Sequence, residues 1–397
     1  MAGLITIDEA QRLVLERARP LPAKRVPLGE AFGRVAAEAV HAEIDLPPFA
    51  SSAMDGFAVR AADTPGRLPI VDESAAGSPA ERPLSGGEAI AIATGAAVPH
   101  GADAVIPVEY VVKHDNEIEV PDQAEAGANV RPVGSDVPRG EAILSAGTQI
   151  GAAQVGALAA AGVAEVSCGV RPRAAVLATG SELRRPGEPL AHGQIYEANG
   201  LILDAQLRSA GALPQLLPTA ADDVAAHRAA IEQGLEADVL ITTGGVSVGP
   251  HDLVREVERE LGVEEVFWGV SVKPGKPISF GVRGATLVFG LPGNPLSALV
   301  GFELFVRPAL ALLQGSTDAL PRWEWGRLAA EVRPNPQRDE LVRGRSAAGE
   351  DGVLLQPLAG RESHQIARAA GADVLVLIPR GDGQLDPDTP VRYLRLP

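Results

Sequence analysis

The chain contains a single cysteine, Cys168, and this scarcity limits the chemistry it can carry. One thiol cannot form an internal disulfide bond, and the sequence has neither paired cysteines nor closely spaced histidines. Such pairs are the usual ligands of zinc and other soft metals, so a soft-metal site is not expected. Any metal that binds should be a hard cation held by oxygen ligands.

Long apolar runs are also missing from the sequence. No stretch approaches the roughly 18 consecutive apolar residues that a membrane span requires. The N-terminus reads MAGLITIDEAQRLVLERARP and has charges where a signal peptide would have its apolar region, so we expect a cytoplasmic protein. The formal net charge of -16 argues against general binding to nucleic acids or membrane surfaces, because both are negatively charged.

What the sequence does contain is enough apolar material for several domains. Its 397 residues are 46% hydrophobic, which favours two to four domains over one core. Thr6 and Glu9 form a capping box ahead of apolar residues at helical spacing, which predicts a helix that ends before Pro20. A second, alanine-rich helix is expected over residues 151–162.

Between these helices the pattern changes to short apolar or alternating runs separated by Gly, Pro and Asp. This pattern predicts a small β domain over residues 45–129. We therefore expect an N-terminal α+β domain formed by residues 1–44 and 130–170, with the β domain inserted into it.

The second half of the chain alternates apolar strands with amphipathic helices over residues 171–318. This alternation predicts a doubly wound parallel sheet with helices on both faces, that is, an α/β domain. Short alternating segments return over residues 319–397 and predict a C-terminal β-barrel-like domain. The predicted fold class is thus multi-domain, with α/β and β domains.

Three unusual loops follow strands of the predicted sheet. They read ATGSEL (178–183), TTGGVSVGPHD (242–252) and GLPGNPLS (290–297). Ligands of open parallel sheets bind beyond the carboxyl ends of the strands, so the three loops should face one cleft. Gly244 and Gly245 would let backbone N–H groups converge there on an anion such as phosphate. A tight strand-to-helix turn without a ligand is the alternative interpretation of the paired glycines.

Acidic residues follow three strands at the same predicted edge: Glu182, then Asp222 and Asp223, then Asp252. Acids in a first helical turn often serve only as caps that favour the helix dipole. Several acids beside a phosphate-binding loop also fit a Mg²⁺ site, because this ion takes carboxylate oxygens and bridges phosphates.

The segment VKPGKP holds Lys273 and Lys276 on a short backbone stiffened by two prolines. Two ammonium groups held close together repel each other, which makes a dianion the natural partner. A plain exposed turn is the alternative. A further loop, SSAMDGFA, carries Asp55, which could act simply in an Asx-turn.

Taken together, the motifs resemble those of the molybdopterin molybdenumtransferase family, the MoeA-type molybdenum insertases, over essentially the whole chain. They are PPFASSAMDGFA, IATGAAVP, NVRPVGSD, ATGSEL, GQIYEANG, TTGGVSVGPHD, FWGVSVKPGKP and LPGNPLSA. The resemblance implies a Mg²⁺-dependent transferase that inserts molybdate into adenylylated molybdopterin and releases AMP in the last step of molybdenum cofactor synthesis. It also implies a homodimer with its cleft between subunits. The adenylyltransferase that makes the substrate and the apoenzymes that receive the product are implied partners.

The resemblance also implies roles for individual residues. Positions that are catalytic in the family correspond in this chain to Asp55, Thr94, Arg131, Asp136 and Glu182. Substrate-binding positions match Thr179, Gly244, Gly245, Ser247, Pro292, Asn294 and Pro295. Molybdate-binding positions match Lys273, Lys276, Ser297, Arg343 and Ser363. Asp222 and Asp252 match acids at the metal and the phosphates.

The chain departs from the family pattern at Gly269, where a Lys or Arg is common. Losing a cation there should weaken oxyanion attraction by about 1 kcal/mol in a partly solvated site, and could alter the preference between molybdate and tungstate. Two other functions stay open: a molybdopterin adenylyltransferase, which typically reads Gly-Gly-Thr-Gly where this chain reads GGVSVG, and a non-catalytic scaffold.

Overall fold

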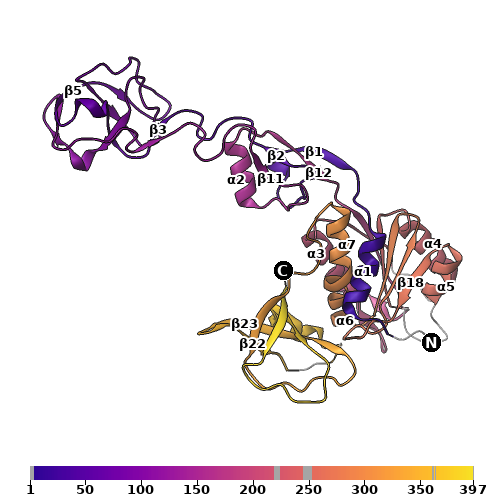
Figure 1. The fold of residues 1–397 in the computed structure, drawn as a ribbon. Coiled ribbons are helices and arrows are strands. Elements are labelled where there is room, and N and C mark those ends of the chain that lie inside the picture. Colours follow the sequence, from indigo (N-terminus) through magenta and orange to yellow (C-terminus); the bar gives the residue numbers. More distant parts are fainter. Residues whose placement is uncertain (1–3, 219–223, 245–252, 360–361, 363, 397) are drawn as a thin grey trace.

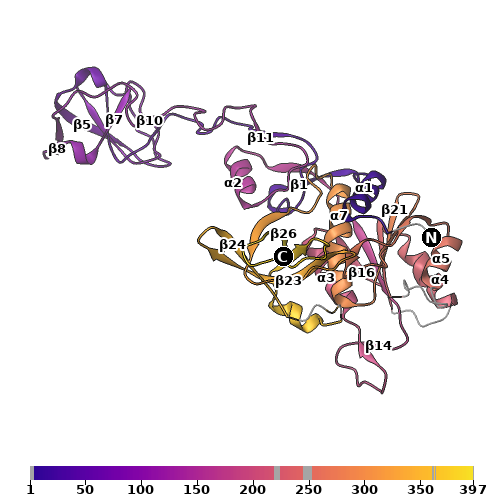
Figure 2. The ribbon, with the colours of Figure 1, turned by 60° about the horizontal axis from the view of Figure 1, so that its bottom comes forward.

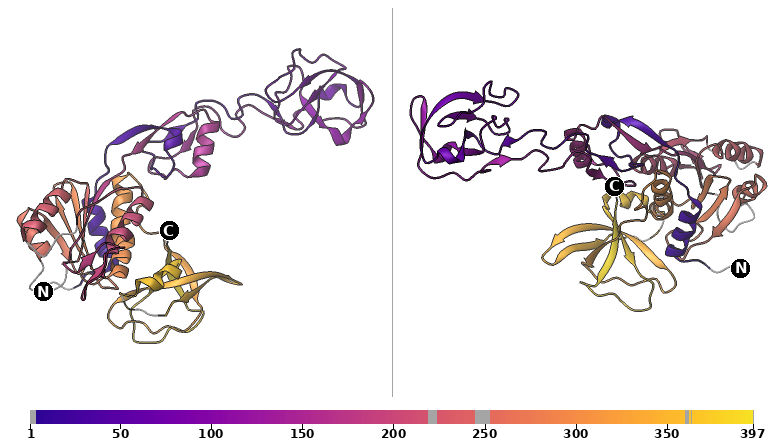
Figure 3. Two further views of the ribbon diagram at one scale, coloured as in Figure 1. Left: turned by 180° about the vertical axis from the view of Figure 1, so that it is seen from behind. Right: turned by 45° about the horizontal axis from the view of Figure 1, so that its top comes forward.

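The computed structural model describes residues 4–218, 224–244, 253–359, 362 and 364–396. The molecule is elongated (Figure 1). A distal β domain lies at one end, a small middle domain follows, and the α/β domain and the C-terminal β domain lie side by side at the other end (Figures 1 and 3).

The α/β domain contains a six-stranded sheet of mixed direction. The strand order is β16 (Leu213–Leu216), β13 (Arg173–Ala178), β17 (Val239–Thr243), β21 (Thr286–Leu291), β20 (Ser279–Arg283) and β18 (Glu264–Trp268). The first four strands are parallel, as predicted, but β20 runs antiparallel to both of its neighbours. The prediction of an all-parallel sheet is therefore wrong at this edge. The reason is local, because Gly284 has φ +61° and allows the tight turn that folds β20 back onto β21.

Helices cover both faces of this sheet, as predicted. On one face, α3 (Asn199–Ser209) and the long helical segment from Pro295 to Leu313 pack on Val176, Ile241 and Phe289. On the other, α4 (Val224–Gly234) and α5 (Leu253–Glu260) pack on Ala175, Leu177 and Leu240. Successive strand residues thus point to opposite faces, both of them buried.

The first helix, α1 (Ile7–Arg17), differs from its predicted domain assignment. Its cap is as predicted, since Thr6 Oγ1 accepts the Glu9 N–H at 3.1 Å. However, Ile7, Ala10 and Val14 are buried in the core of the α/β domain and not in the middle domain (Figure 1). An isolated amphipathic helix must bury its apolar stripe, and here the partner is the long helix of the α/β domain.

That long helix consists of α6 (Pro295–Gly301), a π-helical turn η4 (Phe302–Val306) and α7 (Arg307–Leu313). Its 19 residues, with a mean hydropathy of 1.7 over the most apolar window, are long and apolar enough to cross a membrane. However, 78% of that window is buried inside the fold, so the apolar character of this helix is explained by its place in the hydrophobic core.

The middle domain is discontinuous, which confirms the predicted insertion. β1 (Ala23–Pro27) pairs with β12 (Glu165–Gly169), and β2 (Val40–His41) pairs with β11 (Ala142–Leu144) beside α2 (Ala152–Ala160). The chain leaves and returns through a two-stranded neck that is bridged where Leu46 meets Val137 (Figure 2). Beyond the neck, β3 (Ser51–Ser52) pairs with β10 (Val130–Arg131). The distal sheet has the order β7 (Ala104–Pro107), β4 (Gly56–Val59), β6 (Ala89–Ile92), β5 (Gly66–Ser74), β9 (Glu117–Val120) and β8 (Val112–Lys113).

The C-terminal domain is a closed barrel, which confirms the barrel-like prediction. Its strands are β22 (Glu324–Leu328), β23 (Asp339–Gly349), β24 (Gly352–Pro357), β25 (Val374–Ile378) and β26 (Pro390–Arg395). The ring closes because the long β23 pairs with both β24 and β25. A short strand of the α/β domain, β19 (Val272–Lys273), adds to the free side of β23 and joins the two domains.

Candidate functional site

A cavity of about 860 Å³ lies at the carboxyl ends of β13, β17 and β21. It is lined by residues from all three of the loops singled out in the sequence: Thr179, Gly180 and Glu182, then Thr243 and Gly244, then Gly293, Asn294 and Pro295. The predicted convergence of these loops is therefore observed. Parallel strands bring it about, because their carboxyl ends meet at one edge of the sheet.

Gly244 is required by close packing between two of these loops. Its φ is +89°, and a Cβ atom there would lie 2.6 Å from the carbonyl oxygen of Thr179. Its N–H donates to the carbonyl oxygen of Leu291 at 3.3 Å. The N–H of Gly244 is thus bonded within the fold, and the glycine allows the close approach of the two backbones. The other N–H groups of this loop, which the sequence predicts to converge on an anion, lie outside the described residues. Gly245 and Ser247 lie outside the described residues.

Glu182 lies on the rim of the cavity with an exposed side chain. Its carboxylate folds back over Gly180, where a Cβ atom would come within 2.6 Å of an oxygen. The chain then forms a projecting ribbon in which β14 (Leu183–Arg184) pairs with β15 (Ile195–Tyr196), as Figure 2 shows at β14. The ribbon ends at Glu197, whose carboxylate accepts the N–H of Gly200 at 2.7 Å in the first turn of α3.

The cavity offers carboxylate oxygens of the kind that Mg²⁺ prefers, on Glu182 and Glu197. Within the described ranges, no group of three His, Cys, Asp or Glu side chains could hold a metal. The two acids predicted to bind the metal, Asp222 and Asp252, fall outside those ranges. The two described carboxylates match the oxygen chemistry that Mg²⁺ prefers, but by themselves they do not make up a ligand set.

Asn199 was not predicted as a site residue. It is buried, lines the cavity and donates from Nδ2 to Thr243 Oγ1 and to the carbonyl oxygen of Gly293, both at 2.8 Å. In the sequence it reads only as the start of a helix within GQIYEANG. Its contacts come from loops 44 and 94 residues away, so no local pattern could have identified them.

Lys273 lies at the junction of the α/β domain and the barrel. Its Nζ is 3.3 Å from Oε1 of Glu340, a carboxylate that is only 3% exposed, whereas the Lys273 side chain is 30% exposed. The pairing of β19 with β23 places the two residues opposite each other. Lys276, three residues on, is exposed. The two lysines thus differ in environment, and neither contributes to the walls of the 860 Å³ cavity.

Arg343 and Ser297, two further predicted positions, are both buried. Ser297 is buried on α6, directly after the Asn294 and Pro295 loop. Arg343, on β23, is only 2% exposed and donates to the carbonyl oxygen of Gln365, the neighbour of His364 in the cavity wall. Burial, together with nearby Arg368, lowers the pKa of the Arg343 guanidinium. Ser363 lies outside the described residues.

The remaining predicted positions lie in and near the distal domain. Asp55 Oδ1 accepts the N–H of Thr94 at 2.7 Å, a contact across 39 residues and not the local Asx-turn that was the alternative. Arg131, on β10, is exposed opposite Ser51. Asp136 is exposed in the neck, where its N–H donates to the carbonyl oxygen of Leu46 at 2.9 Å.

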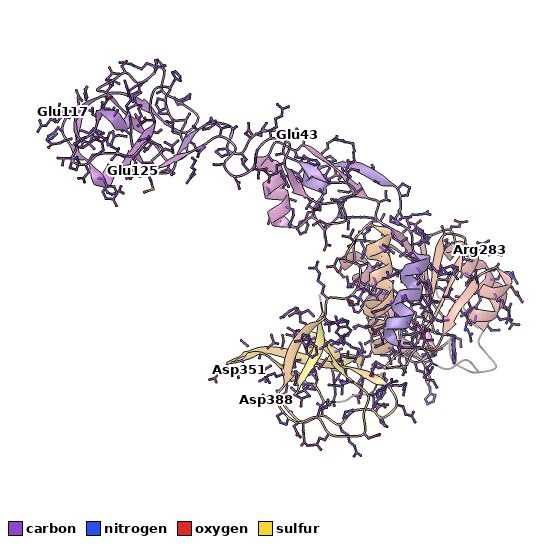
Figure 4. The ribbon with its side chains drawn as sticks, viewed as in Figure 1. Glu43, Glu117, Glu125, Arg283, Asp351 and Asp388 are labelled. Atoms are coloured by element: carbon purple, nitrogen blue, oxygen red, sulfur yellow. The ribbon has the colours of Figure 1, made fainter. Side chains whose placement is uncertain are left out.

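The distal positions are far from the cavity of the same chain. In Figure 4, Glu117 of the distal domain and Arg283 of the α/β domain mark opposite ends of the molecule, with Glu43 between them. One chain therefore brings together the three loops and Asn199, but does not bring the distal residues to them.

The departure at Gly269 has a backbone explanation. Its φ is +90°, and its N–H donates to the carbonyl oxygen of Ile278 at 2.8 Å. A Cβ atom there would lie 2.8 Å from Leu4 Cδ2. A lysine at this position would be strained by the positive φ, so the backbone here favours glycine, whereas the exposed Leu4 side chain could move aside.

Comparisons with known proteins agree with this architecture. Residues 5–162 match the MoeA N-terminal region (domain I and II), residues 175–312 a probable molybdopterin binding domain, and residues 326–396 the MoeA C-terminal region (domain IV). The chain is 40% identical over 389 residues to a protein named molybdopterin molybdenumtransferase 2 from Mycobacterium tuberculosis, covering 94% of this chain and 95% of that protein. It is 37% identical over 395 residues to a molybdopterin molybdenumtransferase from Haemophilus influenzae, covering 96% of each.

Among solved structures, a molybdopterin biosynthesis MoeA protein from Pyrococcus horikoshii OT3 is similar over 99% of this chain and 100% of that one, with a TM-score of 0.85 at 28% identity. The similarity thus includes the distal domain and the barrel as well as the α/β domain. The chain belongs to the MoeA family.

Proposed function

We infer that this protein is a molybdenum insertase, a molybdopterin molybdenumtransferase that acts in molybdenum cofactor biosynthesis. The observation that carries this inference is the 860 Å³ cavity, whose lining residues, all but His364, belong to the segment that matches a probable molybdopterin binding domain. The full-length relatives named as molybdopterin molybdenumtransferases support the same activity.

The proposed substrates are adenylylated molybdopterin and molybdate. The cavity has the volume and the mixture of glycine backbone and polar side chains that suit a nucleotide-linked pterin. Molybdate, a dianion, would be attracted by Lys273, Lys276 and Arg343, with Ser297 as a hydrogen-bonding partner. Ser297 is on α6, which follows Asn294 and Pro295 of the cavity wall, and Arg343 donates to Gln365, the neighbour of His364 in that wall.

The proposed cofactor is Mg²⁺, held by Asp222 and Asp252 with Glu182 nearby. When bound, this ion would neutralise phosphate charge and polarise the anhydride that links AMP to the pterin. The chain's own residues would position the substrate, since Gly244 and Gly293 let the two loops pack closely at the cavity.

The proposed assembly is a homodimer, because the neck and the distal domain, which carry exposed Asp55, Arg131 and Asp136, lie far from the α/β domain of their own chain (Figure 1). The neck and the distal domain, together called the arm, would then supply these residues to the partner's cavity. We expect this enzyme in the cytoplasm, receiving substrate from a molybdopterin adenylyltransferase and delivering product to apoenzymes.

In the proposed reaction, a molybdate oxygen attacks the adenylyl phosphorus. The new P–O bond displaces the molybdopterin phosphate, and the Mo–O bond breaks as the pterin's sulfurs take the metal, which leaves that oxygen on AMP. Oxygen-18 from labelled molybdate should therefore appear in AMP. Label arriving only from water would contradict this direction of attack.

The function itself is tested by mixing the protein with adenylylated molybdopterin, Mg²⁺ and either molybdate or tungstate. We expect AMP release that depends on the oxyanion, together with reconstitution of a cofactor-free molybdoenzyme. Binding of AMP with Mg²⁺, seen as a higher melting temperature without any AMP release, would instead indicate a protein that kept the site and lost the reaction.

A further inference from the structure

Asn199 lies where two loops of the cavity meet. It is the first residue of α3, it is 8% exposed, and it forms part of the cavity wall. Its Nδ2 donates one hydrogen bond to Thr243, at the end of β17, and one to Gly293, in the loop after β21. A single amide group thus joins the ends of two neighbouring strands.

The orientation of this amide follows from its partners. The carbonyl oxygen of Gly293 can only accept, so the nitrogen of the amide must face it. Thr243 Oγ1 donates to the carbonyl oxygen of Pro292 at 3.3 Å and is therefore left to accept from Asn199. Rotating the amide by 180° would set two oxygens against each other, so Oδ1 points away from both loops.

Asn199 Oδ1 is buried and has no hydrogen-bond partner among the described residues. Leaving a buried acceptor unsatisfied destabilises a fold, and such groups in a native structure call for an explanation. Gln206, on the same helix, provides a comparison. It is also 8% exposed, donates twice from Nε2 and has an unsatisfied Oε1, but it is not part of the cavity wall.

We propose that Asn199 is a substrate-binding residue whose Oδ1 accepts a hydrogen bond from an N–H or O–H group of the bound substrate, while its Nδ2 holds the Thr243 and Gly293 loops in place. This proposal rests on the proposed function. Ionised phosphates have no hydrogen to donate, so Asn199 marks the position of an amino or hydroxyl group of the nucleotide or the pterin.

The test compares Asn199→Ala with Gln206→Ala as a matched control. Dissociation constants are measured by calorimetry for AMP and for adenylylated molybdopterin, each with Mg²⁺, and folding is followed by thermal unfolding. We expect Asn199→Ala to raise the Kd on the order of tenfold, because the donor of the ligand loses its partner. Gln206→Ala should lower the melting temperature by a similar amount and leave both Kd values unchanged.

The two ligands distinguish the two sources of the donor. A weaker affinity for AMP as well as for the full substrate would assign the donor to the nucleotide, whereas an effect on the full substrate alone would assign it to the pterin. A crystal structure of the wild-type protein with the bound substrate would show directly which group of the ligand donates to Oδ1. A nearest ligand donor farther than about 3.2 Å from Oδ1 would overturn the proposal.

The proposal and the function on which it rests fail differently. If the wild type binds neither ligand, the proposed function is overturned and Asn199 loses its role with it. If the wild type binds and releases AMP while folded Asn199→Ala binds equally well, only the role of Asn199 is overturned.

Discussion

The α/β domain and the distal β domain present their candidate residues in opposite ways. At the sheet edge, Thr179 and Asn199 are buried and tied to neighbouring loops by hydrogen bonds. In the neck and the distal domain, Arg131 and Asp136 are exposed, on an arm joined to the body by two strands of chain. The sheet edge is therefore formed within one chain, whereas the arm can act only where another surface meets it.

Because of this difference, we expect substitutions at the sheet edge and substitutions on the arm to abolish activity in two different ways. Changes at the sheet edge should damage the site from within, and no partner can repair that subunit. Changes on the arm should leave the subunit's own cavity intact, so that a partner's arm can compensate.

The largest effect is expected for Gly244→Ala. The new Cβ would meet the Thr179 carbonyl oxygen at 2.6 Å, and the backbone at φ +89° would also be strained. Displacing a substrate-positioning loop by about 1 Å can cost a hundredfold in rate, so kcat/KM should fall at least that much. Gly187→Ala is the control, because Gly187 has φ +92° but open space around it. Equal losses in both variants would show that strain, and not the contact, is responsible.

Mixing two inactive variants should restore activity if the arm serves the partner's cavity. Asp136→Ala affects the arm and Glu182→Ala affects the cavity. A heterodimer of the two variants has one intact site, in which the unchanged cavity of one subunit meets the unchanged arm of the other. Since about half of randomly mixed dimers are heterodimers, and each has one intact site of two, about a quarter of wild-type AMP release should return after co-refolding. Mixtures that stay inactive, while sedimentation shows that dimers have exchanged, would contradict a shared site.

Lys276→Ala should weaken the use of molybdate with little effect on folding, because this side chain is exposed. Loss of one cation beside a dianion should raise the KM for molybdate by roughly tenfold and leave the melting temperature unchanged. The control is Lys113→Ala, which removes an exposed lysine of the distal sheet. A molybdate KM that responds equally to both variants would indicate general electrostatics and not a local site.

Gly269→Lys should fail to improve oxyanion use and should cost stability instead. A lysine at φ +90° is strained by about 1–2 kcal/mol, and its Cβ would also have to displace the end of the exposed Leu4 side chain. Gly262→Lys, at φ +85° with open space, separates the strain from the contact. If Gly269→Lys lowers the KM for molybdate at an unchanged melting temperature, the backbone does not require glycine here, and this chain simply lacks a cation that would help bind molybdate.

The smallest effect is expected in the barrel, away from the site, for Glu324→Gln. Hydrogen bonds from Arg395 and then from Tyr393 lower the pKa of Glu324 below its usual value. A lowered pKa in the folded state stabilises the protein above the unfolded-state pKa, and this stability is lost as the pH falls through the folded value. The difference in melting temperature between wild type and variant should therefore shrink as the pH falls below about 4.5. A difference that stays constant from pH 7 to pH 3 would contradict this assignment.

Much of the fold could be predicted because it rests on local periodicity. The alternation of apolar strands with amphipathic helices predicted the α/β domain, and the short runs near residues 45–129 predicted the inserted β domain. The antiparallel β20 was missed, because a single continuous stretch rich in Gly and apolar residues contains two strands joined at Gly284. The packing of α1 was missed as well, since amphipathicity shows that a helix must be covered but not by which domain.

The sequence by itself determined the three glycine-containing loops and their place at the ends of strands, because both depend on short-range pattern. The candidate residues of the arm came from the resemblance to a known family. Only the tertiary structure decided which groups meet. It set Asn199 against Thr243 and Gly293, paired Lys273 with Glu340 across two domains, turned the Gly244 N–H toward Leu291, and kept the arm away from its own cavity. These contacts join residues dozens of positions apart, and they depend on how packed domains bring distant segments together rather than on any local propensity.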